Sequence, residues 1–393
     1  MMLLVFMACH SLGKLSDKEI FPDDIHLYTY EDQIAPVQDI NGLHPTLQDN
    51  FALYTQLTAP NGQYLHLLAQ AGVQQKQLIR ARSILEFYLT DRETLEYGDK
   101  TTVFNAMADN EATLLIFDTE STAEQLIEGE LGDLDLFFQD LYATESLVEG
   151  SSLWLDGSQR DASFEEIFHL VHGAGIDVAW PALAEQIDVV AQQAFEAGIW
   201  TPEQEQLDEW AAEDSVGKEY IISVIDVYYG LWAHQETALY GEYQPSTRVA
   251  LQEEDPQGIA LIESLLPATL DYEVRIDDEF TGVFDSGTSE DWGFKSQYFE
   301  HLRLMGNASS DVYGNALDNH LQGNQADNFL RGEGGEDTAI MQGMRNEYEV
   351  QITDDGILLF DSIADRDGSD YLVGIEWIQF SDQRVSSQEI QPN

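Results

Sequence analysis

The sequence predicts an α+β domain followed by an all-β C-terminal domain, and three observations support this prediction. Between residues 63 and 229, apolar side chains recur at helical spacing in several segments, and short apolar runs typical of strands interrupt them. Gly314, Gly323 and Gly332 then follow one another at a constant interval of nine residues. Finally, residues 365–382 alternate apolar and polar side chains, which is the pattern of a half-buried strand.

Each of these three glycines opens a nine-residue segment with a shared pattern. Small residues or glycine fill its front, an Asn or Asp (Asn319, Asn328, Asp337) takes the sixth place, and Leu or Ala takes the eighth. Glycine at the front permits a tight turn whose carbonyl groups face an ion. An oxygen at the sixth place is a hard ligand that suits calcium. We expect the eighth residue to point inward as a short strand begins.

The pattern resembles the calcium-binding nonapeptide of RTX proteins, and residues 365–382 are similar to the run that closes the roll in serralysin-type secreted proteases. The resemblance implies a parallel β-roll over residues 306–393, in which loops eighteen residues apart share calcium. Asn319 would then face Asp337, and Asn328 would face Asn346. Because Asn replaces Asp twice, we expect one or two ions. The implied calcium ligands are Asp318, Asn319, Asp327, Asn328 and Asp337.

The charge of the chain limits its partners. With 73 acidic and 17 basic residues among 393, its formal net charge is −56. Such a chain has no basic surface to neutralise phosphates, which excludes nucleic acid as a partner, and it is repelled by an anionic membrane. Its 43% hydrophobic content permits ordinary cores. Calcium or a saline environment would each relieve the self-repulsion.

The beginning of the chain carries little structural signal. We expect residues 1–19 to be a leader or a disordered segment, because residues 1–9 are apolar but lack the basic residues of a signal peptide. Cys9 is the only cysteine, so no intrachain disulfide forms. No segment reaches the roughly 18 apolar residues of a membrane span. The RTX resemblance implies secretion by a type I route, with the export signal near the C-terminus, and we expect a monomer.

The remaining elements are predicted in chain order. Short apolar runs indicate strands at 25–30, 113–117 and 153–155, and helical spacing indicates helices at 63–90, 163–172, from Pro181 onward, and at 219–229. Ser163 is a plausible N-cap of its helix. Pro245 marks a boundary, which gives an α+β domain at 20–245 and a β-rich connector at 246–305 ahead of the roll.

The candidate active site lies in the helix predicted at 163–172. Glu165, Glu166 and His169 form the pattern E-E-x-x-H. It resembles the zincin signature H-E-x-x-H, in which two metal ligands four residues apart flank a general base. Glu219, on the later apolar helix, resembles the third ligand of gluzincins. The resemblance implies Glu165, His169 and Glu219 as ligands of zinc, Glu166 as the base, and strand 113–117 as the substrate-binding edge strand.

The substitution of Glu165 for the first histidine changes the expected chemistry. Two carboxylates make the ion a weaker Lewis acid and favour harder metals such as Mn, Fe or Ca. His172, one turn beyond His169, is a possible substitute ligand, although a structural role fits it better. Asp226 is expected to support the site or to be solvated. Alternatively, the acidic residues at the start of the helix only complement its dipole.

Two functions therefore remain open on the sequence alone. The first is a secreted, calcium-stabilised metallopeptidase that hydrolyses protein or peptide substrates with Glu166 as base. The second is an inactive extracellular calcium-binding or adhesion protein derived from such an enzyme, which would account directly for the lost histidine. Metal content separates them, because the first requires a transition metal and the second only calcium.

Overall fold

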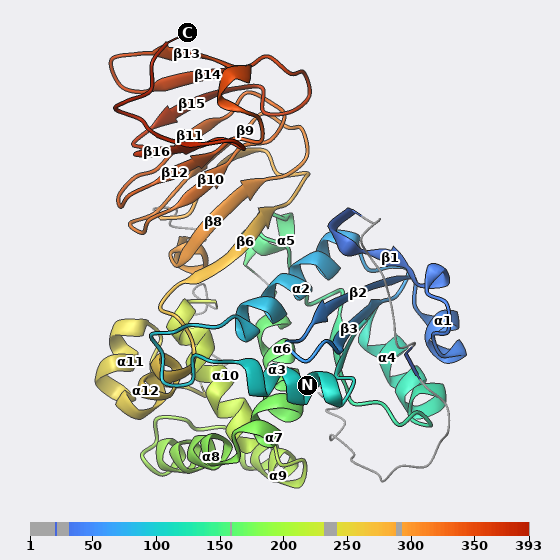
Figure 1. Cartoon of the computed structure of the whole chain (residues 1–393). Helices are drawn as coiled ribbons and strands as arrows, with labels where there is room; N and C mark the ends of the chain where they lie inside the picture. The colour runs from blue at the N-terminus through green and yellow to red at the C-terminus, as the bar shows by residue number, and fades with distance from the viewer. Residues whose placement is uncertain (1–19, 22–30, 158, 232–241, 288–292, 393) are drawn as a thin grey trace. The chain divides into compact units, whose positions relative to one another are not determined.

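The computed structural model of the chain describes residues 20–21, 31–157, 159–231, 242–287 and 293–392 (Figure 1). The chain forms two compact units. The described residues of Met1–Leu147, Arg160–Tyr228 and Thr237–Pro267 form the first unit, and those of Val148–Gln159, Tyr229–Glu236 and Ala268–Asn393 form the second. The leader expected at 1–19 and the strand expected at 25–30 lie outside the described residues. None of the helices in the described part combines the length and the hydropathy that crossing a bilayer requires.

A five-stranded mixed sheet is the centre of the first unit. Its order is β1-β2-β3-β4-β5, with antiparallel pairing from β1 to β3 and parallel pairing from β3 to β5. Because successive side chains of a strand point to opposite faces, the apolar run of β4 supplies both faces of the sheet. The strands are β1 (Ala35–Pro36), β2 (Leu53–Thr58), β3 (Tyr64–Ala69), β4 (Thr113–Phe117) and β5 (Phe138–Tyr142).

Helices cover both faces of this sheet. On one face, Leu115 and Phe117 of β4 pack with Leu47 of α1 (Pro45–Asn50) and Ala123 of α4 (Glu120–Leu126) in a buried apolar cluster. On the other face, α2 (Gln75–Leu89), α3 (Thr101–Asp109) and α6 (Ser163–Val171) contact the strands, with α6 against β4 and β5 (Figure 1). The arrangement therefore fixes α6 beside the edge strand β5.

The other helices of the first unit follow α6 along the chain. A π-helical segment extends α6 over His172–Ile176, and Gly175 lies there so close to Val103 of α3 that a Cβ atom would collide with it. The helices are α7 (Asp177–Ala179), α8 (Pro181–Glu196), α9 (Gln204–Ala212), α10 (Val216–Tyr229), α11 (Arg248–Glu254) and α12 (Pro256–Leu265).

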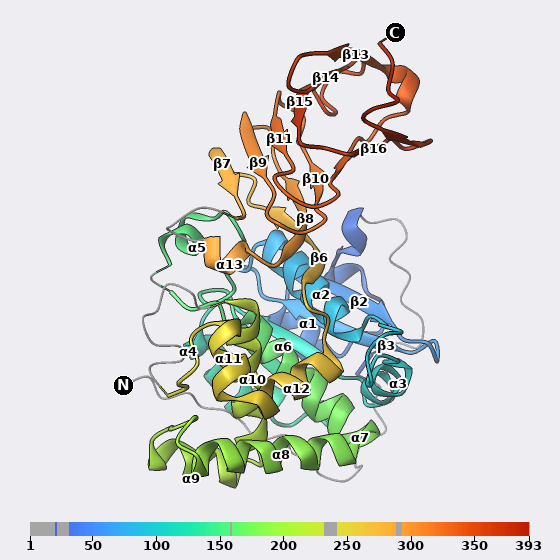
Figure 2. The same ribbon diagram turned by 90° about the vertical axis from the view of Figure 1, so that its left-hand side faces the viewer.

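Two six-stranded sheets form the second unit, and the chain alternates between them from β6 to β12. The first sheet has the order β17-β16-β12-β10-β8-β6 and the second β13-β14-β15-β11-β9-β7. Figure 2 shows that the strands of each sheet follow one another along the length of the unit. The strands are β6 (Leu270–Ile276), β7 (Gly282–Asp285), β8 (Phe299–Leu304), β9 (Ser310–Tyr313), β10 (His320–Gln322), β11 (Phe329–Arg331), β12 (Thr338–Ile340), β13 (Tyr348–Ile352), β14 (Ile357–Asp361), β15 (Ser369–Val373), β16 (Trp377–Gln379) and β17 (Arg384–Ser386).

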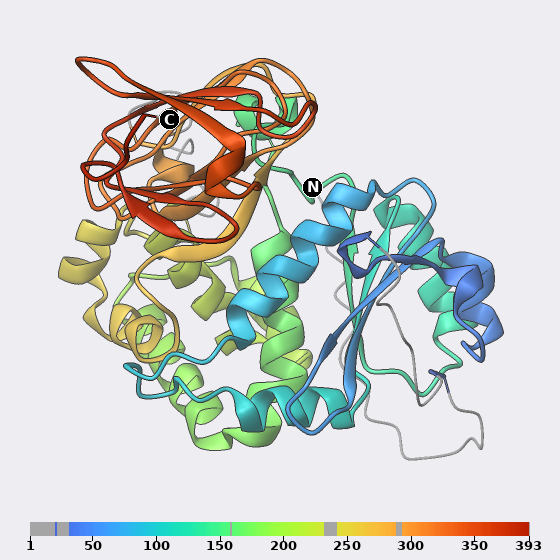
Figure 3. The same ribbon diagram turned by 45° about the horizontal axis from the view of Figure 1, so that its top comes forward.

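The nine-residue repeats set the register of these sheets. Leu321 of β10 pairs in parallel with Ala339 of β12, eighteen residues later, so one coil takes two repeats. The eighth-place residues Leu321, Leu330 and Ala339 are each 0% exposed, which confirms that they point inward. Viewed toward its C-terminal end, the unit shows its coils stacked over one another (Figure 3). The sequence periodicity therefore predicts the winding of this part of the chain correctly.

The constant interval ends after β12. Residues 341–368 contain the antiparallel hairpin of β13 and β14, so β11 pairs with β15 through Phe329 and Tyr371 rather than with a strand eighteen residues on. The expectation that Asn328 faces Asn346 is therefore wrong, and Asn328 faces Asp370 instead. The run 365–382 is likewise not one strand. It forms β15 and β16, separated by a turn at Gly374, whose φ is 65°.

Four further predictions of local structure are corrected. The helix expected at 63–90 begins only at Gln75, because Tyr64–Ala69 pairs as the central strand β3. The strand expected at 153–155 is the short helix α5 (Ser152–Asp156), whose N-cap Ser151 accepts the N–H of Trp154. The first half of the connector expected to be β-rich, at 246–305, is helical over α11 and α12, and a short helix, α13 (Gly293–Ser296), precedes β8. Strand 113–117 is not an edge strand, because β4 lies between β3 and β5.

Burial of His66 on β3 gives the first unit a pH dependence that can be measured. Its ring stacks on Phe21, its Nδ1 lies 2.7 Å from the Tyr54 hydroxyl, and burial lowers its pKa from 6.5 to about 3. Unfolding therefore binds a proton between these two values, and the stability contributed by neutral His66 is present above pH 6.5 and lost as the pH falls toward 3. As the pH falls from 6 to 4, the free energy of unfolding should decrease less in His66→Asn than in the wild type. The difference between the two slopes should be about 1.4 kcal/mol per pH unit. Identical slopes for both proteins in chemical denaturation would contradict this.

Candidate metal centre

The helix α6 is positioned by a buried ion pair at its start. Asp161 pairs with Arg80 of α2, and its Oδ1 accepts the backbone N–H of Ser163 at 3.1 Å. Ser163 is thus the first helical residue and not the N-cap, and its hydroxyl instead donates to Ser146 at 3.2 Å. All nine residues of α6 are buried. A helix buried on all sides must find partners for every polar side chain that it carries.

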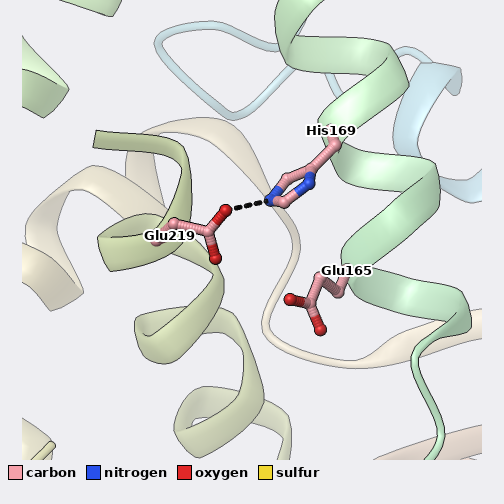
Figure 4. A group of neighbouring side chains, drawn as sticks. All are labelled: Glu165, His169 and Glu219. Atoms are coloured by element: carbon pink, nitrogen blue, oxygen red, sulfur yellow. Dashed lines mark ion pairs between the residues drawn. The ribbon is translucent and has the colours of Figure 1, made fainter. Parts of the chain in front are cut away.

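Two of these polar groups converge with a third from α10. Glu165 and His169 are one turn apart on α6, and Glu219 faces them from α10 (Figure 4). One ligand atom from each lies within 4.8 Å of the others, and His169 Nε2 is 3.6 Å from Glu219 Oε1. Metal bonds of about 2.0–2.2 Å in a tetrahedral site place neighbouring ligand atoms about 3.3–3.6 Å apart. The pair of His169 and Glu219 has this separation, and a bound ion would draw the group as a whole slightly closer together. The structure therefore brings together the three residues that the sequence pattern singled out.

Burial makes charge costly at this centre. Glu165, His169 and Glu219 are 4%, 7% and 7% exposed. Burial raises the pKa of Glu219 to about 8, and it lowers the pKa of His169 to about 3. The neutral imidazole is the form that binds metals. The carboxylates become ionised at neutral pH when a cation lies beside them, because the cation offsets the cost of burial. A set of one imidazole and two carboxylates thus fits a divalent ion.

Arg160 is the cation in direct contact with this centre, and the charge of Lys218 also acts on Glu219 and His169. Its guanidinium forms an ion pair with Glu165, and its Nη2 lies 3.8 Å from Asp226 Oδ2 on α10. Burial raises the pKa of Asp226 to about 7, and Arg160 opposes this rise. Asp226 therefore supports Arg160 rather than the three converging groups. A single arginine offsets only part of the negative charge buried between the two helices.

Glu166 occupies the neighbouring position toward the sheet. Its Oε2 accepts a hydrogen bond of 2.8 Å from Gln139 Nε2 of the edge strand β5, and it lies 3.8 Å from His169 Nδ1. Burial, followed by the charges of Glu145 and Asp140, raises its pKa well above the usual range. A general base must be ionised at the working pH, so Glu166 could act as one only if a cation beside the centre lowers this pKa.

His172 does not join the centre. Its Nε2 lies 3.6 Å from Asp177 Oδ1 in the segment that follows α6, and burial lowers its pKa to about 3. His172 supplies no atom to the group of Glu165, His169 and Glu219 whose ligand atoms lie within 4.8 Å of one another. Its use as a substitute ligand is therefore not supported, and its contacts are those of a structural residue.

Several residues around the centre escaped the sequence analysis. Arg160, Gln139 and Glu145 come from loops and from β5, and no spacing rule connects them with α6. One signal was available for Arg160. The chain has only 17 basic residues, so an arginine five positions before Glu165 is conspicuous.

The second unit places the predicted calcium ligands at the turns between its strands. Asn319 Oδ1 accepts the N–H of Asn315 at 2.7 Å, and its Nδ2 donates to the carbonyl of Phe299 at 3.0 Å. Asn328 does the same with Asn324 N–H at 2.8 Å and the Ser310 carbonyl at 2.7 Å. Each side-chain amide thus donates a hydrogen bond to a backbone carbonyl of the preceding coil. These two turns are held by protein hydrogen bonds.

Asp337 and Asp370 differ from the two asparagines in their hydrogen bonds. Asp337 Oδ1 accepts the N–H of Asn319 at 2.8 Å, but its Oδ2 is buried without a hydrogen-bond partner among the described residues. Asp370 repeats this arrangement with the N–H of Asn328 at 3.1 Å. Burial raises the pKa of Asp337 to about 7, and it also raises the pKa of Asp370 well above its usual range. Asp370 was missed by the sequence analysis, although Gly368-Ser369-Asp370-Tyr371-Leu372 repeats the end of the nonapeptide.

Two other predicted ligands also make backbone contacts. Asp318 Oδ1 accepts the N–H of Glu336 at 2.7 Å, and Asp327 Oδ1 accepts that of Ser369 at 2.8 Å.

The same turns explain why each repeat begins with glycine. A Cβ atom at Gly314, Gly323 or Gly332 would collide with the side chain at the sixth place of its own repeat. The glycine and the sixth residue are therefore a single packing unit.

Comparisons with known proteins give little beyond this geometry. No protein-family model matches the chain, and no curated protein matches it. Among solved structures, the extracellular lipase LipA from Serratia marcescens shows a likeness at 10% sequence identity with a TM-score of 0.19. The match covers 41% of this chain and 30% of that chain, so less than a third of LipA is represented. A likeness of this size carries no argument about fold or activity.

Replacing Asn328 tests whether its amide substitutes for calcium. We expect Asn328→Asp to lose about 1–3 kcal/mol of stability in the absence of calcium, because the donor to the Ser310 carbonyl becomes a carboxylate. Added calcium should restore much of the loss by binding the new oxygen. Asn328→Ala should lose a similar amount without recovering, and Asn307→Ala, an exposed control, should change little. Thermal unfolding with EGTA or with calcium measures all three, and equal responses of the Asp and Ala variants to calcium would contradict the prediction.

Proposed function

We propose that this protein is a metal-dependent hydrolase with a zincin-like N-terminal domain and a calcium-binding β-roll of the RTX type behind it in the chain. In this proposal Glu165, His169 and Glu219 hold a divalent transition metal and Glu166 is the general base in peptide-bond hydrolysis. The observation that supports it most directly is the convergence of the three ligand groups within 4.8 Å between α6 and α10.

The donor set determines what the metal contributes. A bound divalent ion polarises a carbonyl group and lowers the pKa of water. Glu165 and Glu219 would also bring two negative charges, which make the ion a weaker Lewis acid than one held by two imidazoles and one carboxylate. We therefore expect zinc, manganese or iron at this centre and a modest rate of hydrolysis.

Glu166 supplies the proton transfer in this proposal. Its carboxylate lies next to the ligand His169 and is oriented by Gln139 of β5, an edge strand beside which an extended peptide can lie. Glu166 takes the proton of the attacking water and later gives it to the leaving amine. This assigns the substrate-binding edge to β5, in place of the strand 113–117 expected from the sequence.

One observation favours a second function, that of an inactive relative. The ion pair between Arg160 and Glu165 already offsets one ligand charge, as expected for a centre that has lost its metal. Removing Arg160 distinguishes the two. If the carboxylates bind metal, Arg160→Met should be destabilised without metal and recover with added zinc. If the centre is only an ion-pair cluster, the loss of about 3–5 kcal/mol should persist, since one charge is left buried and uncompensated.

The second unit supports the calcium part of the proposal. Asp337 and Asp370 each present a buried oxygen without a hydrogen-bond partner among the described residues, and both need a cation to ionise at neutral pH. We therefore place the one or two calcium ions at these turns. Secretion by a type I route is part of the proposal through the RTX-like repeats and the acidic composition.

Metal content and hydrolysis together test the first site. Elemental analysis of the full chain, purified without chelators, should find about one transition-metal equivalent that is lost in His169→Ala and Glu219→Gln. Glu166→Gln should keep the metal and lose at least about a hundredfold in hydrolysis of an unfolded protein substrate, because only the base is removed. Glu185→Gln, exposed on α8, is the matched control. A wild-type protein without transition metal, or one that keeps the metal after both ligand substitutions, would refute the site.

Calcium removal tests the second unit. EGTA should melt the strands that follow residue 306 in the full chain, because calcium binding is coupled to folding. In Asp337→Asn and Asp370→Asn an amide replaces the carboxylate, as it does at Asn319 and Asn328. The double variant should therefore respond less to EGTA than the wild type does. Circular dichroism that is unchanged by EGTA in the wild type would remove the calcium part of the proposal while leaving the metal centre untouched.

A further inference from the structure

A pair of histidines lies on the outer face of the second unit, far along the chain from the residues of α6. His301 of β8 and His320 of β10 are directly paired in adjacent parallel strands. Their neighbours Leu302 and Leu321 are buried, so the alternation of side chains along a strand turns both imidazoles outward. Both rings are partly exposed, which leaves them accessible to an ion from solution.

The two ring nitrogens that face each other have the separation of metal ligands. His301 Nδ1 and His320 Nδ1 are 2.9 Å apart, while the rings are stacked with centroids 4.4 Å apart and planes 29° apart. Two bonds of about 2.0–2.1 Å at a right angle place two ligand nitrogens about 2.9 Å apart, which is the separation observed. A ring nitrogen binds in the plane of its ring, so the two rings would turn out of their stack to hold one ion.

The surroundings favour a cation. Glu300 Oε2 lies 3.9 Å from His301 Nε2, and Glu273 of β6 pairs with His301 in the sheet. Asp271 and Asp318 add negative charge, whereas Arg384 lies near His320 and Arg275 and Arg303 pair with Glu273. Burial lowers the pKa of both histidines, which keeps them neutral and able to bind a metal at pH 7.

We infer that His301 and His320 form a transition-metal site on the outer face of the second unit, separate from the centre on α6. Right-angled coordination by two imidazoles is typical of Ni²⁺ and Cu²⁺ in square-planar or octahedral geometry. Water completes the coordination, and Glu300, whose Oε2 lies near the other ring nitrogen of His301, adds negative charge beside the site. The site would take up such ions from solution and would crosslink two strands that belong to successive coils of the roll.

Metal titration of the full chain tests this inference independently of the proposed function. The experiment uses His169→Ala as background, which removes the first centre, and calorimetry with Ni²⁺ in the presence of excess calcium. We expect one remaining site, weakened more than about tenfold by His301→Ala or by His320→Ala and absent in the double variant. Gln322→Ala, two residues along the same strand face, should bind as the background does.

A spectroscopic measurement separates metal binding from a structural role of the histidine pair. Bound Cu²⁺ should show coupling to two imidazole nitrogens in electron paramagnetic resonance, and to one in each single variant. If the variants melt at lower temperature but take up Ni²⁺ and Cu²⁺ as the background does, the pair only packs, and the inference is wrong. The inference is also wrong if the His169→Ala background protein takes up no Ni²⁺ or Cu²⁺ at all.

Discussion

Buried negative charge with few protein cations beside it is the constraint on which both units depend. The chain has 73 acidic residues and 17 basic ones, so most carboxylates must remain in water. Glu165, Glu166, Glu219 and Asp226 are nevertheless buried between or beside two helices. Ionised carboxylates in such a place are costly unless a cation is near. Arg160 meets part of this need, and a divalent ion is the natural complement for the rest.

The second unit meets the same constraint in two ways. At Asn319 and Asn328 an amide stands in place of a carboxylate, so the sixth place of the repeat carries no charge and a backbone carbonyl receives a hydrogen bond. At Asp337 and Asp370 the carboxylate is kept, and one oxygen of each has no protein donor among the described residues. Direct contacts with calcium would therefore lie at the later turns, whereas the turns at Asn319 and Asn328 are closed by protein hydrogen bonds.

The local elements were predictable where one pattern dominated. The helix at 163–172 and the helix containing Glu219 were correct, because each carries a continuous apolar face. The strand at 64–69 was missed inside a longer apolar segment, since its side chains are buried on both faces and short apolar runs do not reveal their period. The hairpin of β13 and β14 was also missed, because it interrupts a repeat whose period the sequence itself had established.

By itself, the sequence determined the winding of the repeats, the inward position of Leu321, Leu330 and Ala339, and the trio Glu165, His169 and Glu219. The features of the repeats follow from spacing along one chain segment. The three polar residues stand out because a charged side chain in an apolar helix needs a metal or a charged partner. Only the tertiary structure decided that Arg160 meets Glu165, that Gln139 orients Glu166, and that Asp370 faces Asn328. These contacts join segments whose separation follows no period, so they exist only once the sheet and the coils have formed.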